Sequence, residues 1–275
     1  MAEINKIFTV IDPTTKNQRA LNRAVLGAKS TGARIHAYLC IPSNMNAEHF
    51  HDFIEAETSK YQAWIDELVK PIRADGIDID VEIERHDDWR SAMGPAATRS
   101  GCDLIIKNAH QRSASKTTSL SSSDWSLFRS APCPVMIAKS ERSSGSGNVL
   151  LAIDPMKENS AYEKVIDESL GFARVAVASY REGTLHVLSA YEGSDVKVSA
   201  ENLAKRTGLE TAHVHVTGDR VEEAIEKCAT EIDAELIVIG VAESPRLSGV
   251  LFGTTTEWLL NHLDRDVMVV IPQNA

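Results

Sequence analysis

The sequence has neither a long apolar run nor an excess of positive charge. No segment of the 275 residues approaches about eighteen uninterrupted apolar residues, the length that indicates a membrane span. Acidic residues outnumber basic residues 39 to 29, and the net charge of −10 opposes the attraction to phosphate backbones on which most nucleic-acid binding depends. We therefore expect a cytoplasmic protein with no membrane contact and no nucleic-acid partner.

Metal, redox and catalytic motifs are also lacking. Cys40, Cys102, Cys133 and Cys228 form no C-x-x-C pair, which argues against a zinc ribbon or a dithiol motif and indicates buried or half-buried free thiols. There is no G-x-S-x-G, H-E-x-x-H or G-x-x-x-x-G-K-[ST] signature. We predict no catalytic residue and no enzyme, with weak nucleotide hydrolysis as the alternative.

The chain does contain an internal repeat. "KIFTVIDPTTKN" parallels "NVLLAIDPMKEN" and aligns Asp12 with Asp154. "CDLIIKNA" then parallels "AELIVIGV", and "PVMIAKS" parallels "DVMVVIP", in the same order. The Ser/Gly-rich "SERSSGSGN" between the two sets is typical of a flexible connector. The pattern predicts domains at residues 1–140 and 148–275 with a linker at 141–147.

Each half alternates strand-like and helix-like segments. Five short runs rich in Ile, Val and Leu occur in the first half ("FTVI", "RIHAYLCI", "IDVEIE", "DLIIK", "PVMIA") and five in the second ("VLLAI", "TLHVLSAY", "AHVHV", "ELIVIG", "DVMVVI"). Stretches with helical spacing, such as "QRALNRAVLGAKSTG" with Gly32 as its stop, separate them. Strands joined through helices pair in parallel. We predict α/β halves, each an open five-stranded, mainly parallel Rossmann-like sheet with helices on both faces.

Several motifs together indicate a family. Four features carry a resemblance: the strand that ends in Asp154, the strand that ends in Gly240, the loop that closes on Gly253 and Thr254, and the final "DVMVVIP". Through them the chain resembles a universal stress protein domain repeated in tandem. "DLIIKNAHQR" and "DWSLFRSAPCPVMIAK" are similar to the E-type branch of bacterial universal stress proteins. The resemblance covers nearly the whole chain.

This resemblance implies two adenine nucleotide alpha hydrolase-like domains and a role in the stress response, including resistance to DNA damage. It also implies an intramolecular pseudo-dimer, in which the final strands near residues 135–138 and 267–271 meet and cover their edges. Association of two chains into a homodimer stays open, and no protein partner is identified.

The resemblance also points to a phosphate loop in the second half. ATP-binding members have Gly, two residues, Gly, nine residues, Gly, then Ser or Thr; here the spacing is kept as Gly240, Glu243, Gly253 and Thr254. Glycines let backbone N–H groups approach phosphate oxygens, and a helix N-terminus adds partial positive charge. Gly253, Thr254 and Thr255 suit that role, although either threonine could simply cap the helix.

Glu243 stands where the family has its middle glycine. A carboxylate that points into the site repels phosphate, and Arg246 would offset this only in part. The expected ligand is therefore ATP or another small phosphorylated metabolite, such as an amphipathic one with its tail against Leu247, Val250, Leu251 and Phe252. The competing hypothesis is a protein interaction scaffold without a nucleotide.

The base pocket follows from the same resemblance. Asp154 would lie beside the adenine or ribose, with Ala152 and Ile153 next to it and Ser189 or Ala190 at the end of the second strand. The alternative role for Asp154 is an Asp-Pro turn in which its carboxylate binds nearby backbone amides.

The first half has lost the phosphate loop. Asn108, Gln111, Ser121 and Ser122 occupy the equivalent positions, so we expect no ATP there.

Histidines and one long segment complete the candidates. His49 with His51, His86 beside Asp87 and Asp88, and His213 with His215 suggest zinc ligands, but no third or fourth ligand lies at a reliable spacing, and we predict no metal site. Residues 46–70 have no equally long counterpart in the second half. Their apolar residues recur at helical spacing, which indicates packing on the sheet, or alternatively a cover over a cavity or the partner domain.

Overall fold

The structure is a computed structural model that describes residues 2–43, 51–109, 121–139, 146–155, 160–192, 198–241 and 254–271. The strands of the first half are β1 (Lys6–Val10), β2 (Arg34–Pro42), β3 (Ile79–His86), β4 (Leu104–Asn108) and β5 (Val135–Ala138). Its helices are α1 (Arg19–Thr31), α2 (His51–Ala74), α3 (Trp89–Ser100) and α4 (Ser122–Ser130).

The second half repeats this order. Its strands are β6 (Val149–Ala152), β7 (Leu185–Ala190), β8 (Val214–Thr217), β9 (Leu236–Gly240) and β10 (Asp266–Val270). Its helices are α5 (Ser160–Ala178), α6 (Ala200–Thr207), α7 (Val221–Glu231) and α9 (Thr254–His262), with the short 3₁₀ helix η1 (Thr211–His213) before β8. All ten predicted strand segments are confirmed.

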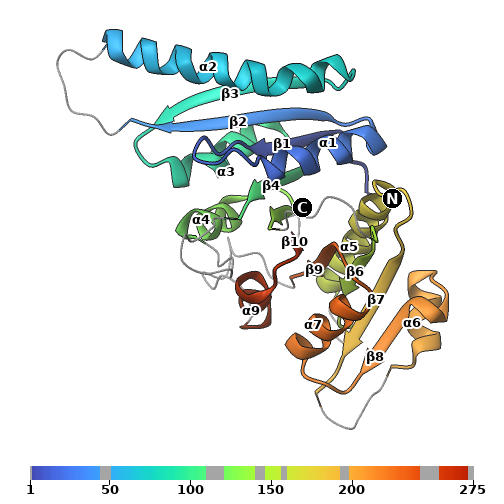
Figure 1. The fold of residues 1–275 in the computed structure, drawn as a ribbon. Helices are drawn as coiled ribbons and strands as arrows, with labels where there is room; N and C mark the ends of the chain where they lie inside the picture. Colours follow the sequence, from blue (N-terminus) through green and yellow to red (C-terminus); the bar gives the residue numbers. More distant parts are fainter. Residues whose placement is uncertain are drawn as a thin grey trace.

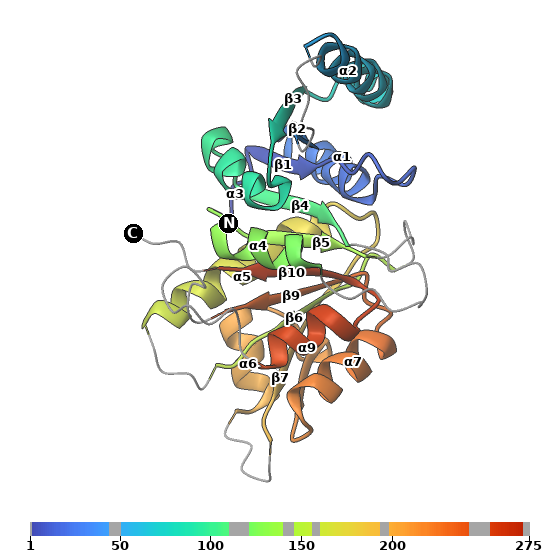
Figure 2. The same ribbon diagram turned by 90° about the vertical axis from the view of Figure 1, so that its left-hand side faces the viewer.

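One ten-stranded sheet runs through the molecule in the order β3-β2-β1-β4-β5-β10-β9-β6-β7-β8 (Figures 1 and 2). Every strand pair within a half is parallel, whereas β5 and β10 pair antiparallel, with Val269 opposite Val135. The predicted five-stranded parallel sheets and the predicted meeting of the final strands are thus confirmed. Pairing turns two exposed edges into the centre of the sheet.

Helices cover both faces of this sheet. Buried residues of α1, α2, α5 and α6 share one apolar core with one face, and those of α3, α4, α7 and α9 share a second core with the other. Because both faces are buried, the inner strands β5, β6 and β9 are continuous apolar runs, whereas the edge strands β3 and β8 alternate apolar with polar residues. Gly32 ends α1 in the left-handed region at φ 76°, as its position predicts. None of the helices in the described part of the chain is both long and apolar enough to cross a membrane.

The long helix α2 packs on the sheet of its own half. Ile65 and Val69, four residues apart, are fully buried in the first core, and Tyr61, Trp64 and Leu68 pack against that core. The described part of residues 46–70 therefore serves packing; the side chains of Phe50, Phe53 and Ile54 lie outside the described residues.

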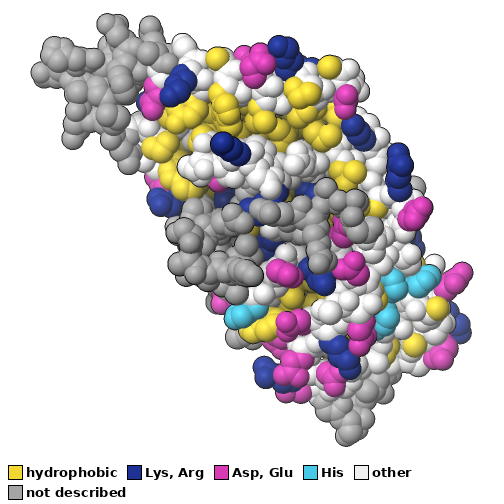
Figure 3. All heavy atoms as spheres, viewed as in Figure 1, with side chains coloured by type: hydrophobic (Ala, Val, Ile, Leu, Met, Phe, Trp, Pro, Cys, Tyr) yellow, Lys and Arg dark blue, Asp and Glu magenta, His cyan; other side chains and the backbone are white. Residues whose placement is uncertain are grey.

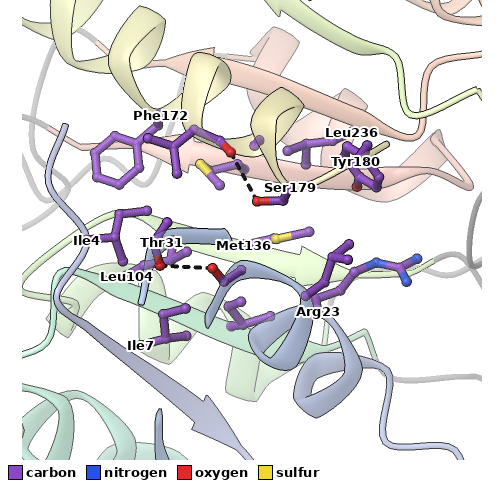
Figure 4. Close-up of a pocket in the computed structure, with 16 residues that line it drawn as sticks. Ile4, Ile7, Arg23, Thr31, Leu104, Met136, Phe172, Ser179, Tyr180 and Leu236 are labelled. Carbon is purple, nitrogen blue, oxygen red and sulfur yellow. Dashed lines mark hydrogen bonds between the residues drawn. The ribbon is translucent and has the colours of Figure 1, made fainter. Parts of the chain in front are cut away.

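A buried polar network joins the two halves where β5 meets β10. The carboxylate of Asp266 accepts hydrogen bonds from Nε of Arg23 at 2.6 Å and from the backbone N–H of Lys139 at 2.8 Å. Nζ of Lys139 donates to the carbonyl of Leu263 at 2.8 Å, near the end of α9. Beside this network, apolar residues of both halves, including Ile7 and Phe172, line a cavity of about 50 Å³ (Figure 4). So small a cavity is a gap in the packing rather than a ligand site.

Candidate functional site

A cavity of about 160 Å³ opens at the carboxyl edge of the second half, beyond β6, β7 and β9. This is the edge at which open α/β sheets bind their ligands. Its lining residues are Ala152, Ile153, Asp154, Tyr162, Leu188, Ala190, Val221, Ile225, Ile239, Gly240, Thr255, Thr256 and Leu259. Six of the ten residues predicted from the sequence are therefore in one wall: Ala152, Ile153, Asp154, Ala190, Gly240 and Thr255.

Asp154 follows β6 and is exposed at the rim of this cavity. Its backbone N–H donates to the hydroxyl of Tyr162 at 3.2 Å, and burial raises the pKa of that tyrosine. The equivalent Asp12 accepts from the backbone N–H and the hydroxyl of Thr14, at 2.9 and 2.6 Å, which is the kind of turn that the sequence offers as the alternative for Asp154. For Asp154 the ligand role and the turn role both stay predictions, because residues 156–159 lie outside the described residues.

Ser189 is the predicted residue that the fold turns away from the cavity. It is fully buried, and its hydroxyl donates to the hydroxyl of Tyr191 at 2.8 Å. Side chains alternate along a strand, so Leu188 and Ala190 reach the cavity while Ser189 between them does not.

Gly240 ends β9 in contact with α5. A Cβ atom at this position would lie 2.6 Å from Cγ1 of Val165 and 2.8 Å from Oγ of Ser169. Close packing of the helix on the strand therefore already requires a glycine, whether or not a phosphate binds nearby.

The first turn of α9 closes the cavity. Thr254 begins the helix, and Oγ1 of Thr255 donates to the carboxylate of Glu222 at 2.6 Å. That hydrogen bond lowers the pKa of Glu222. Glu243, Gly253 and Arg246, together with the apolar residues predicted near them, lie outside the described residues, so their roles stay predictions.

Sequence reasoning missed the part of the wall that comes from helices. Tyr162 of α5, Val221 and Ile225 of α7 and Thr256 of α9 all line the cavity. The spacing of four between Val221 and Ile225 was the available signal, because residues so spaced share one helix face. Which face meets the cavity is set by tertiary packing.

The equivalent edge of the first half has a cavity of about 210 Å³, and Lys107 and Asn108 are among the residues that line it. Nζ of Lys107 and Oδ1 of Asp124 form a buried ion pair at 2.6 Å. The other carboxylate oxygen of Asp124 accepts from the backbone N–H of Ser121 at 2.7 Å, which completes a capping box at the start of α4.

Asn108, which replaces the first glycine, is buried, and its side-chain oxygen accepts from the backbone N–H of Ala20 at 2.7 Å. The side chains of Asn108 and Asp124 are therefore both bound within the protein itself.

Three histidines of the second half, His186, His213 and His215, form a group. Figure 3 shows cyan side chains on this half, at the right of the molecule. Nδ1 of His186 and Nε2 of His215 are hydrogen-bonded at 3.0 Å, and the ring of His213 lies 5.1 Å from that of His186, centroid to centroid. Burial lowers the pKa of His186 to about 4 and also lowers that of His215. His213 ends η1 rather than lying on a strand, which corrects the sequence-based placement.

The candidate His86 has a structural partner. Nδ1 of His86 accepts from the backbone N–H of Asp88 at 3.0 Å, and Asp88 caps α3. Among the described side chains, no group of three or more His, Cys, Asp or Glu is arranged to hold a metal ion. The side chains of His49 and His51 lie outside the described residues.

Comparison with known proteins agrees with this architecture. The model of the Universal stress protein family matches residues 3–139 and 148–270. The chain therefore belongs to the universal stress protein family, as a tandem member. A role in the stress response follows from this membership.

Individual relatives resemble the E-type branch. The chain is 25% identical to universal stress protein E of Escherichia coli K12, with 99% of this chain and 95% of the relative covered. It is 24% identical to universal stress protein E of Photorhabdus laumondii, with 99% and 96% covered. These two similarities confirm the resemblance to the E type.

Solved structures share the fold. A protein of Pseudomonas aeruginosa UCBPP-PA14 assigned to the universal stress proteins has a TM-score of 0.83 and 26% identity, over 98% of this chain and 94% of that one. A universal stress protein from Archaeoglobus fulgidus DSM 4304 has a TM-score of 0.79 at 20% identity, over 99% and 100% of the two chains.

Proposed function

We propose that the protein is a cytoplasmic regulatory module of the stress response, including resistance to DNA damage, whose second half binds ATP or another small phosphorylated ligand. In this proposal residues 1–140 and 148–275 are two domains, joined by the linker 141–147, and only the second binds the ligand. The observation that carries it is the cavity beyond β6, β7 and β9, which unites six of the predicted residues in one wall.

The size of the cavity supports part of a nucleotide. Pockets that enclose whole drug-sized ligands measure roughly 300–1,000 Å³. At about 160 Å³ the cavity suits a base with its sugar, so the phosphates would lie outside it, towards the start of α9.

The chemistry of the walls agrees with such a pose. Apolar side chains of Val221, Ile225 and Leu259 would contact the flat base. The carboxylate of Asp154 at the rim is an acceptor for ribose hydroxyls, and backbone N–H groups at the start of α9 are donors for phosphate.

Thr256 offers a sharp test. It stands where the first half has Asp124, at the third position of the helix, so a Thr256→Asp variant would reproduce that half's internal anion. An acidic residue in the first turn is compatible with a helix, so folding should be retained. We expect Mg-ATP to bind at least tenfold more weakly, about 1.4 kcal/mol, by isothermal titration calorimetry.

The matched control is Thr256→Asn, which has nearly the same shape without the charge and should retain most of the affinity. Equal affinity in the wild type and in the Asp variant would refute the site. A wild-type protein that binds neither ATP nor ADP, and whose unfolding temperature neither nucleotide raises, would favour the interaction scaffold.

Two observations are also consistent with the alternative functions, a scaffold or a binder of an amphipathic metabolite. Gly240 is already required by the packing of α5, so its presence is also consistent with a scaffold that never binds a nucleotide. The apolar walls suit an amphipathic phosphorylated metabolite as well, which the same calorimetry would detect by competition with ATP.

A further inference from the structure

Two cysteines of the first half face one another at the amino ends of neighbouring strands. Cys102 precedes β4, Cys133 precedes β5, and their sulfur atoms lie 3.5 Å apart. Both side chains are buried, with 8% and 4% of their surfaces exposed. This end of the sheet is opposite the carboxyl edge that holds the candidate ligand site.

We propose that Cys102 and Cys133 are a redox modification site that forms an intramolecular disulfide when the protein meets a peroxide. The thiolate of one cysteine attacks a peroxide oxygen, breaks the O–O bond and becomes a sulfenic acid, with release of water. The second thiolate then attacks the sulfenic sulfur and displaces hydroxide, which leaves as water. In total two thiols lose two hydrogens and two electrons, and one hydrogen peroxide becomes two waters.

The backbone around the pair is already held in place. β4 and β5 are in parallel register, with Ile105 opposite Val135, and the backbone N–H of Ile105 donates to the carbonyl of Pro134 at 3.0 Å. A disulfide needs a separation of about 2.05 Å between the sulfurs, so they must approach by roughly 1.5 Å. Side-chain rotation can supply this together with a small shift of the connections that carry the cysteines, residues 101–103 before β4 and 131–134 before β5. Gly101 lies directly before Cys102, which makes such a shift easier.

The other two cysteines lack these features. Burial raises the pKa of Cys40, and it raises the pKa of Cys228 to about 11. The hydrogen bond from Cys133 instead lowers the pKa of Cys102, which favours the nucleophilic thiolate. Cys40 is the most exposed of the four, so a reaction governed by exposure alone would occur there first.

The disulfide would connect the ends of two strands at the middle of the molecule. β5 pairs with β10 of the second half, so the cross-link fastens the strand on which the junction between the halves depends. We expect the oxidised protein to unfold at a higher temperature than the reduced protein, because the cross-link restricts the unfolded chain.

The test is peptide mapping of the full-length protein after peroxide. Reduced protein is treated with hydrogen peroxide, denatured in the presence of an alkylating reagent and digested without reductant. We expect loss of two hydrogens from the intact mass, one peptide pair linked through Cys102 and Cys133, and full recovery of both thiols with dithiothreitol.

Variants locate the bond. Cys102→Ser and Cys133→Ser should each lose the cross-linked pair, whereas Cys228→Ser, a buried cysteine outside the pair, should retain it. The wild-type map decides the question even if a variant fails to fold. The proposal is overturned if both thiols are still alkylated at a dose that oxidises Cys40, or if Cys102 proceeds to sulfinic acid without a link to Cys133.

Discussion

The two halves place the same elements around the same kind of edge and then fill that edge differently. In the first half Lys107 and Asp124 meet in a buried ion pair, and Asp124 caps α4. In the second half the equivalent positions are Ile239 and Thr256, which carry no charge and line the cavity. One fold thus holds a buried ion pair at this position in one copy and uncharged side chains that line a cavity in the other.

A second pair of equivalent positions shows the same divergence. His36 lies opposite Phe8, and His186 lies opposite Leu150, at matching places in the two sheets. His36 contacts the carboxylates of Asp80 and Glu82. His186 contacts other histidines. The backbone repeat fixes where a side chain stands, while the neighbouring side chains decide what it contacts.

The largest difference between the halves should appear when the third residue of the equivalent helices, Asp124 in one and Thr256 in the other, is replaced by alanine. Asp124→Ala leaves Lys107 buried without its ion-pair partner, which typically costs 3–5 kcal/mol of the free energy of unfolding. Thr256→Ala, its matched change in the second half, should cost less than about 1 kcal/mol. Urea unfolding followed by circular dichroism measures both, and equal losses would contradict the proposed division of roles.

Removing the buried polar network between the halves should have the next largest effect on the free energy of unfolding. Asp266→Ala withdraws the acceptor from Nε of Arg23 and from the backbone of Lys139, both buried, and we expect a loss of about 2–4 kcal/mol. If the halves stabilise one another through this network, unfolding should also separate into two transitions by calorimetry. A variant as stable as the wild type would show that apolar packing of β5 on β10 suffices.

Acid should weaken the second half through its histidines. The pKa of His186 is lowered to about 4 by burial, whereas in the unfolded chain it is near 6.5, so the unfolded state binds more protons between these values. The free energy of unfolding should therefore fall as pH decreases from about 6.5 to 4. We expect a drop of about 1 kcal/mol for this group, allowing for its partial exposure.

The stability of a His186→Gln variant should decrease less over that pH range. At His215 the charge of Glu231 acts in the opposite direction to burial, because it raises the pKa of that histidine. Urea midpoints measured at several pH values give the slope. A His36→Gln variant serves as the control in the first half, and identical slopes for wild type and His186→Gln would rule the effect out.

Most of the fold could be predicted because the sequence states it twice. Ten apolar runs separated by helical segments fix a parallel sheet in each half, and the edges left by β5 and β10 are covered when they pair. The placement of His213 was wrong, because a 3₁₀ turn, which has no strong sequence pattern, ends there, and the strand begins two residues later than the expected segment.

The site was predicted less completely, for a physical reason. Residues at strand ends follow from topology, and five of those predicted reach the cavity. Partners that meet only through packing, such as Lys107 and Asp124, seventeen residues apart, do not follow from local pattern. The capping box between Ser121 and Asp124 was nevertheless visible as S-x-x-D before an apolar segment.

The most direct test of the central claim is native mass spectrometry of the freshly purified full-length protein, before and after addition of Mg-ATP. If only the second half holds a phosphorylated ligand, the bound stoichiometry should reach one per chain, and Thr256→Asp should need at least tenfold more Mg-ATP to reach the same occupancy. Two nucleotides per chain, or equal occupancy of the wild type and the Thr256→Asp variant at the same Mg-ATP concentration, would contradict the account.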